Sequence, residues 1–281
     1  MGCPCALHIE TQSESTARSA LAIAEHELRR LDRKYSHYRD DSLVAEIAAI
    51  AGTDRTLQVD DETAALFDFA ANLHQQSNGL FDITTGALTR LWDLRNGLLP
   101  DEDAIAQARR RSGWQHLHWQ RPALRLPIAG MQLDLGGIVK EYAADRVALL
   151  CRDAGFAHGL VDLGGDLAVI GAHRDGSAWR IGIKTPERPE HASAQIDISE
   201  GGLATSGDYE RCIIIDGRRY SHIINPHSGQ PIESFASVSV SAPSCLVAGA
   251  AATMAMLLGV DEGAEYLREL GLPHFCLART A

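Results

Sequence analysis

Apolar residues recur at helical spacing along several parts of the chain. Leu21, Ala24 and Leu28 fall on one face of a helix, which predicts a helix over residues 15–36. The same spacing predicts further helices over residues 61–78, 100–113 and 138–155, and a helix followed by a strand over residues 263–278. Glycine closes several of these segments and marks where each helix is expected to stop.

Strand patterns lie between the predicted helices. They cover residues 116–137, 158–173, 179–186 and 211–226. Pro122 and Pro127 interrupt the first of them, which indicates short strands and turns. Asp216 and Gly217 predict the turn of a hairpin in the last. Helices and hairpins are interspersed without a regular βαβ rhythm, so we predict an α+β fold with antiparallel sheet.

One long uncharged run, from Cys245 to Gly259, could be a membrane span or a core helix. It is shorter than the roughly 20 apolar residues that a bilayer requires, and about half of it is Ala or Gly. Ser244 is a suitable N-cap, and Gly259 a suitable stop. The run is therefore predicted to be a buried helix, and we do not expect the protein to be a membrane protein.

Composition narrows the function classes. The formal net charge of −11 argues against a general nucleic-acid binder, because phosphate contacts need a basic surface. The six cysteines are mostly scattered, which favours buried reduced thiols over a metal site or a disulfide framework. Residues 1–12 lack the basic and apolar regions of a signal peptide. A cytoplasmic location is expected, although a chain trimmed of its leader would look the same.

Polar and glycine-rich segments at the ends of predicted elements are candidates for chemistry. Gly136 and Gly137 join a predicted strand to a predicted helix, where free N–H groups would suit a phosphate. Lys140, in the first turn of that helix, is either an added cation or a solvated surface residue. Thr205 and Ser206 are expected in a donor-rich turn. No Rossmann fingerprint, P-loop or hydrolase motif is present.

His222 is predicted to lie inside a hairpin strand, followed by a polar turn at residues 225–229. A lone strand histidine is more often structural than catalytic, but the polar turn beside it favours a functional role. Histidine is also the side chain best suited to accept a proton at neutral pH. Both interpretations stay open from the residues alone.

Together, these stretches resemble the family of FAD:protein FMN transferases, the ApbE-type flavin transferases. No single motif is decisive, but the ordered set is specific and spans nearly the whole chain. The matching stretches are SHYRDDSLVAEI (36–47), GLFDITTGAL (79–88), LDLGGIVKEYAADRV (133–147), GLVDLGGDLAVIG (159–171), WRIGIKTP (179–186), LATSGDYER (203–211), YSHIINPHSGQPI (220–232) and the Ala-rich helix near the C-terminus.

The resemblance implies a single domain over residues 1–281, built as two intertwined lobes of α+β structure with antiparallel sheets and with FAD in the cleft between them. It also implies an activity: FAD is split at its pyrophosphate, FMN is transferred to a Thr or Ser hydroxyl of a target flavoprotein, and AMP is released. A divalent cation, usually Mg²⁺, assists. The expected acceptor is a flavoprotein of a membrane electron-transfer complex.

Site residues follow from the matching motifs. The resemblance implies that His222 is the general base that activates the acceptor hydroxyl, that Tyr38 flanks the flavin, and that Asp134 contacts the adenosine part. It implies that Gly137, through its carbonyl, and Thr253 hold the metal. The full set of implied FAD contacts is Met1, Tyr38, Leu80, Phe81, Asp82, Asp134, Lys140, Thr205, Ser206 and Ile223.

The chain departs from the family pattern in its Ala-rich helix. Gly249 stands where the family has a metal-binding Asp, and Ala252 stands at a second, sometimes acidic, position. A hard cation normally takes at least one carboxylate. Three interpretations follow: a working transferase whose metal is held mainly by the phosphates of FAD, an FAD-binding protein with weak or no transferase activity, or a slow hydrolase of FAD. The first is favoured because His222 and Tyr38 are retained.

Overall fold

The structure is a computed structural model. It describes residues 2–92, 98–185, 188–208 and 212–279, of which 184–185 and 188–191 are described by their backbone alone. The predicted α+β class is confirmed, since every pairing between the named strands is antiparallel.

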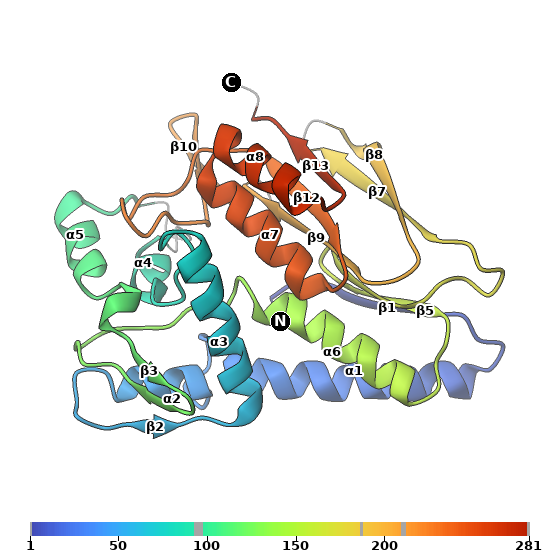
Figure 1. Cartoon of the computed structure of the whole chain (residues 1–281), viewed down its shortest axis with the longest axis horizontal. Helices are drawn as coiled ribbons and strands as arrows, with labels where there is room; N and C mark the ends of the chain where they lie inside the picture. Colours follow the sequence, from blue (N-terminus) through green and yellow to red (C-terminus); the bar gives the residue numbers. More distant parts are fainter. Residues whose placement is uncertain (1, 93–97, 186–187, 209–211, 280–281) are drawn as a thin grey trace.

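The central feature is a six-stranded antiparallel sheet (Figure 1). Its strands, in spatial order, are β1 (Cys5–Ile9), β5 (Gly159–Leu163), β6 (Asp166–Gly171), β9 (Gly202–Gly207), β12 (Ser237–Ala242) and β13 (His274–Leu277). The register of β9 against β12 places Thr205 opposite Ser239 and Ser206 opposite Val238. Apart from β5 and β6, which form a hairpin, neighbours in this sheet come from distant parts of the sequence.

Helices cover one face of this sheet. α6 (Val139–Asp153) contacts β5 and β6, and α7 (Cys245–Leu258) contacts β9 and β12. The two helices also contact each other, and together with the sheet they enclose the main core. α1 (Glu14–Tyr35) lies beside α6, and α8 (Val260–Leu270) packs on α7 (Figure 1).

The predicted buried helix at residues 245–259 is confirmed as α7. The Ser244 hydroxyl accepts from the N–H of Val247, as an N-cap does. Asp145 of α6 accepts from the N–H groups of Cys245 and Leu246, so the first turn of α7 is tied to its neighbour. Among the described helices, none is both long and apolar enough to cross a bilayer.

A second group of elements lies to the left of the large sheet in Figure 1. It comprises α2 (Leu43–Ala49), β2 (Leu57–Gln58), α3 (Asp61–Gln76), α4 (Gly86–Leu91), α5 (Glu102–Arg110), a 3₁₀ turn (Trp114–His116), β3 (His118–Gln120) and β4 (Ala123–Arg125). The three short strands form a sheet in the order β2-β4-β3. The predicted helices over residues 61–78 and 100–113 are thus confirmed within one or two turns.

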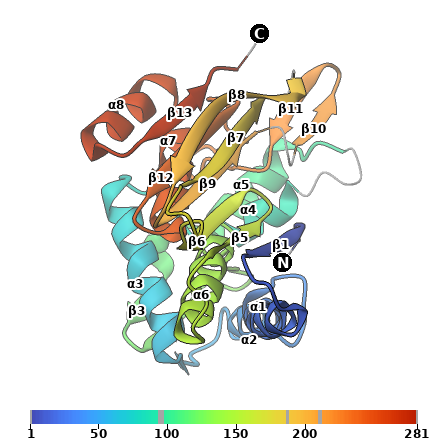
Figure 2. The same cartoon turned by 90° about the vertical axis from the view of Figure 1, so that its right-hand side faces the viewer.

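Two hairpins complete the fold. β7 (Trp179–Thr185) pairs with β8 (Arg188–Ile198), and this hairpin packs on the face of the large sheet away from α6 and α7 (Figure 2). β10 (Cys212–Ile215) pairs with β11 (Arg218–Ser221). Asp216 and Gly217 both have positive φ, 50° and 77°, which is the geometry of the predicted two-residue turn.

Two local predictions were wrong. Thr205 and Ser206 do not lie in a turn but in β9, in the interior of the large sheet, because pairing with β6 and β12 outweighs the weak strand propensity of their small polar segment. His222 does not lie inside a strand. It follows β11 directly, where the chain leaves the hairpin, and its side chain is exposed.

Candidate functional site

An interior polar cluster lies where α6, α7, β6 and β9 meet, and it starts from an ion pair. Lys140 Nζ lies 2.6 Å from Asp166 Oδ2. Asp166 is 1% exposed, and its other oxygen accepts from the N–H of Thr205 at 3.1 Å. Burial lowers the pKa of Lys140, but the charges of Asp166 and Glu141 outweigh it and raise that pKa overall. The ammonium is therefore held charged beside a buried carboxylate.

Hydroxyl groups extend the cluster onto α7. Ser206 Oγ and Thr253 Oγ1 are 2.9 Å apart, which joins β9 to α7. The alternation of a strand turns the Thr205 side chain to the opposite face, where its hydroxyl meets that of Ser239 at 2.8 Å. Of the predicted residues, Ser206 and Thr253 thus meet through their side chains. Lys140 is linked to them through Asp166, which accepts from the N–H of Thr205, the residue before Ser206.

Glu141 belongs to the same cluster, although the sequence patterns did not point to it. It is 7% exposed and lies against Gly249 of α7. A Cβ at Gly249 would be 2.5 Å from Cγ of Glu141 and 3.2 Å from its Oε1. Burial raises the pKa of Glu141 to about 8, and the charge of Asp166 acts in the same direction. Its only signal in the sequence is an acidic residue inside an otherwise apolar helix face.

Two aspartate turns lie next to the start of α6. Asp82 Oδ1 accepts from both the N–H and the hydroxyl of Thr84, at 2.7 Å each, and its Oδ2 accepts from the N–H of Trp114. Asp134 Oδ1 accepts from the N–H of Gly136 at 2.8 Å. The prediction that this N–H is free for a phosphate is therefore wrong. Both aspartates order their own turns.

These two turns lie side by side. The N–H of Asp134 donates to the carbonyl of Ile83 at 2.7 Å. The Phe81 ring lies against Gly137, where a Cβ would be 3.5 Å from Cε2 of the ring. Leu80 is half-buried against the main core. The structure thus brings Leu80, Phe81, Asp82, Asp134 and Gly137 to one place, and α6 with Lys140 begins two residues after Gly137.

The segment after β11 reaches the same region. Ile223 is half-buried against the main core, and its carbonyl accepts from the N–H of Ile232. Farther along, the side chain of His227 lies near Gly79, where a Cβ would be 3.2 Å from its Nε2. The predicted base, His222, is exposed at the start of this segment.

Tyr38 and Met1 are the remaining predicted contacts. Tyr38 follows α1 and is 71% exposed, and its ring lies against that of His37, with the centroids 3.9 Å apart and the planes tilted by 44°. The carbonyl of His37 accepts from Arg90, which ties this segment to α4. Met1 lies outside the described residues.

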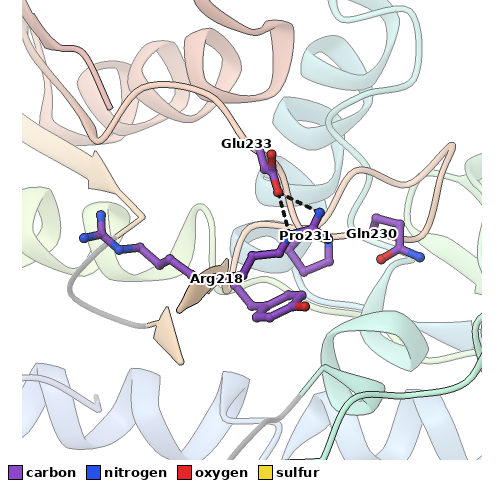
Figure 3. A pocket seen from close by; sticks show the side chains of 6 residues that line it. Arg218, Gln230, Pro231 and Glu233 are labelled. Atoms are coloured by element: carbon purple, nitrogen blue, oxygen red, sulfur yellow. Dashed lines mark hydrogen bonds and ion pairs between the residues drawn. The ribbon is translucent and has the colours of Figure 1, made fainter. Parts of the chain in front are cut away.

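A hollow of about 260 Å³ lies beside β11 (Figure 3). An ion pair at 2.7 Å joins two of its lining residues, Arg218 and Glu233, as Figure 3 shows. Its lining residues are Arg218, Arg219, Tyr220, Gln230, Pro231 and Glu233. None of them is among the predicted FAD contacts, so this hollow is not the predicted cleft.

Comparison with known proteins identifies the family. Residues 1–275 match the ApbE family. The chain belongs to the ApbE family. An FAD:protein FMN transferase from Klebsiella pneumoniae (strain 342) is 33% identical over 276 residues, which cover 95% of this chain and 79% of that protein. The resemblance inferred from the motifs is confirmed.

Solved ApbE structures share the fold. An ApbE protein from Thermotoga maritima MSB8 matches with a TM-score of 0.89 at 27% identity, covering 98% of this chain and 91% of that one. The apo flavinyl transferase ApbE of Pseudomonas stutzeri matches with a TM-score of 0.86 at 32% identity, covering 100% of this chain and 89% of that one.

This ApbE chain offers oxygen donors for a cation, but not a complete set. Within the described ranges, no group of three or more His, Cys, Asp or Glu residues gathers closely enough to hold a metal ion. The interior polar cluster provides the carboxylate of Glu141 and the hydroxyl of Thr253, and Gly137 lies before the helix that carries Glu141. A hard cation accepts such oxygens, and it would complete its shell with phosphate or water.

Proposed function

We propose that this protein transfers FMN from FAD to a Thr or Ser hydroxyl of a target flavoprotein and releases AMP. The observation that carries the proposal is that Lys140, Ser206 and Thr253, from three separate motifs, belong to one polar cluster around the buried Asp166. The relatives named FAD:protein FMN transferase support it, because they match most of the chain.

The proposed reaction is a displacement at phosphorus. The acceptor oxygen forms a bond to the FMN phosphorus, the bond from that phosphorus to the bridging pyrophosphate oxygen breaks, and AMP leaves with the bonding electrons. His222 takes the proton of the hydroxyl as the new bond forms. A positioned base of this kind is worth about 10²–10⁴-fold in rate. The exposure of His222 supports this role, since the hydroxyl must arrive on another protein.

Lys140 is proposed to place positive charge beside the pyrophosphate. Its ammonium is already held by Asp166, so little side-chain freedom is lost when a phosphate approaches. Thr253 and the carbonyl of Gly137 are proposed to hold Mg²⁺, which when bound would neutralise charge that develops on the phosphate oxygens. The turns of Asp82 and Asp134 are proposed to position Phe81 and Gly137 against FAD.

A second candidate is FAD binding without efficient transfer. The observation that favours it is Gly249, which gives α7 no carboxylate at a position where the family resemblance implies one. A weakly held cation would leave the pyrophosphate charge uncompensated. Hydrolysis of FAD to FMN and AMP is a third outcome, in which water replaces the acceptor hydroxyl.

One assay separates the three candidates. The protein is incubated with FAD, Mg²⁺ and an ApbE acceptor domain, and covalent flavin is scored by fluorescence in a denaturing gel, with FMN and AMP measured by chromatography. Labelled acceptor with AMP release supports the transferase. Tight FAD binding without label, or FMN release without acceptor, would instead establish the second or the third candidate. The acceptor is proposed to be a flavoprotein of a membrane electron-transfer complex.

A further inference from the structure

We infer that Glu141, on α6, supplies a carboxylate ligand for the cation. The helix α7 provides no carboxylate of its own, because it carries Gly249 at the corresponding position. The inference rests on the proposed function in one respect: the cation is the one that would accompany the pyrophosphate of FAD. It adds a residue that the family resemblance does not point to.

The first argument is one of space. Without any side chain at Gly249, the side chain of Glu141 fills the volume beside α7. A Cβ at that position would be 2.5 Å from Cγ of Glu141, closer than real Cβ atoms approach, and 3.0 Å from its Cδ. One carboxylate can occupy this volume, either from α7 or from α6. In this chain it comes from α6.

The second argument is an unsatisfied group. Oε2 of Glu141 is buried and has no hydrogen-bond partner among the described residues. A buried polar atom without a partner is costly, and native structures rarely keep one without a reason. The neighbouring Asp166 already has Lys140 as its cation. Glu141 is therefore the carboxylate that a bound cation would satisfy.

The third argument is the set of oxygen donors on the side of α7 that faces Glu141. Thr253 lies one helical turn beyond Gly249 and so faces the same side of α7. Its hydroxyl is held by Ser206 at 2.9 Å, which fixes its direction. A carboxylate, a hydroxyl and phosphate oxygens form the all-oxygen set that Mg²⁺ and Mn²⁺ prefer. Softer cations prefer sulfur ligands, which this set of donors does not include.

The test measures cation binding directly and does not depend on turnover. Mn²⁺ is titrated into protein saturated with FAD, and free Mn²⁺ is followed by electron paramagnetic resonance, with FAD alone as the blank. Glu141→Gln keeps the shape of the side chain and removes its charge. We expect it to weaken Mn²⁺ binding by at least about tenfold, as loss of a supporting group at a metal site does. Asp153→Asn, an exposed change on the same helix, should leave Mn²⁺ binding as in the parent protein.

A double variant that moves the carboxylate from α6 to α7 distinguishes loss of a cation ligand from general damage to the site. Gly249→Asp alone should lower the melting temperature, because Glu141 fills its space. Glu141→Gly combined with Gly249→Asp should regain the Mn²⁺ binding that Glu141→Gly alone loses. Recovery in the double variant would show that one carboxylate is needed in this volume and that either helix can provide it.

The inference is overturned if Glu141→Gln binds Mn²⁺ as tightly as the parent protein, or if the parent complex binds Mn²⁺ no better than free FAD. Either result would leave Glu141 as a protonated structural carboxyl. A parent protein that binds FAD and Mn²⁺ through Glu141 but labels no acceptor would instead contradict the proposed function alone. Failure to bind FAD would contradict both.

Discussion

Gly249 of α7 and Glu141 of α6 share one volume: a Cβ on the glycine would lie 2.5 Å from Cγ of the glutamate. A missing side chain on one helix is thus matched by a buried carboxyl from the other. The contact lies within the packing between α6 and α7. Both the stability of this helix pair and the chemistry of the interior polar cluster depend on it.

Gly249→Ala should destabilise the protein although alanine favours helices. The added methyl group meets Glu141, and overpacking of this kind costs about 1–3 kcal/mol. The gain in helix propensity of about 1 kcal/mol offsets only part of that. Chemical denaturation of the single variants and of the double variant Glu141→Ala/Gly249→Ala forms a mutant cycle. The same substitution should be neutral or stabilising once Glu141 is shortened, and equal costs in both backgrounds would refute the contact.

The stability of the packing between α1, α3 and α6 should depend on acid. Glu62 accepts from Arg30 at 2.6 Å, from Lys34 at 2.7 Å and from Tyr142 at 2.9 Å. Arg30 is the main reason that the pKa of Glu62 is lowered to about 2 from its ordinary 4.5. Since the folded state binds this proton less readily, the stabilisation is present above pH 4.5 and is lost as the pH falls toward 2.

Glu62→Gln should therefore lower the free energy of unfolding by about 2 kcal/mol at pH 7. This is the typical contribution of hydrogen bonds to a charged group. It should also flatten the pH dependence of stability between about pH 4.5 and pH 2. Thermal melts across this range measure both effects. Glu265→Gln, which changes an exposed residue of α8, serves as the control. A parallel loss of stability with acid in the Glu62→Gln and control proteins would argue against the assignment.

Substitutions at Thr205 and Thr253 can be compared directly. Each threonine hydroxyl meets one serine hydroxyl, but only that of Thr253 lies beside the proposed cation site. Thr253→Val removes the partner of Ser206 and the proposed cation ligand, so it should cost about 1 kcal/mol in stability and weaken Mn²⁺ binding in the FAD complex. Thr205→Val removes only the hydroxyl that meets Ser239. It should cost a similar stability and leave Mn²⁺ binding unchanged. Equal effects of both changes on Mn²⁺ binding would place the cation elsewhere.

Sequence patterns predicted much of the fold because local signals mark its long elements. Ser244 and Gly259 bounded α7 correctly, and Asp216-Gly217 marked the β10–β11 turn. The strand β9 was not predicted, because its extended conformation depends on pairing with β6 and β12, which are far from it in sequence. Short polar strands carry too little propensity of their own to be predicted.

The site was predicted unevenly for a similar reason. Motifs singled out Lys140, Ser206 and Thr253, and the structure links these through Asp166 and Thr205. They also showed that Gly249 brings no carboxylate. That Glu141 fills the space beside it depends on how α6 packs on α7, which spacing along one helix does not reveal. How two helices that are far apart in the sequence contact each other depends on the packing of the whole core.

His222 provides the last prediction. His222→Gln keeps a polar side chain but cannot take up the proton of the acceptor hydroxyl, so flavin transfer should slow by about 10²–10⁴-fold. FAD binding, followed by flavin fluorescence, should change little, because the loss concerns the acceptor and not the flavin. His227→Gln alters another exposed histidine of the same segment and should keep most of the transfer rate. A His222→Gln protein that labels its acceptor at the parent rate would exclude His222 as the base.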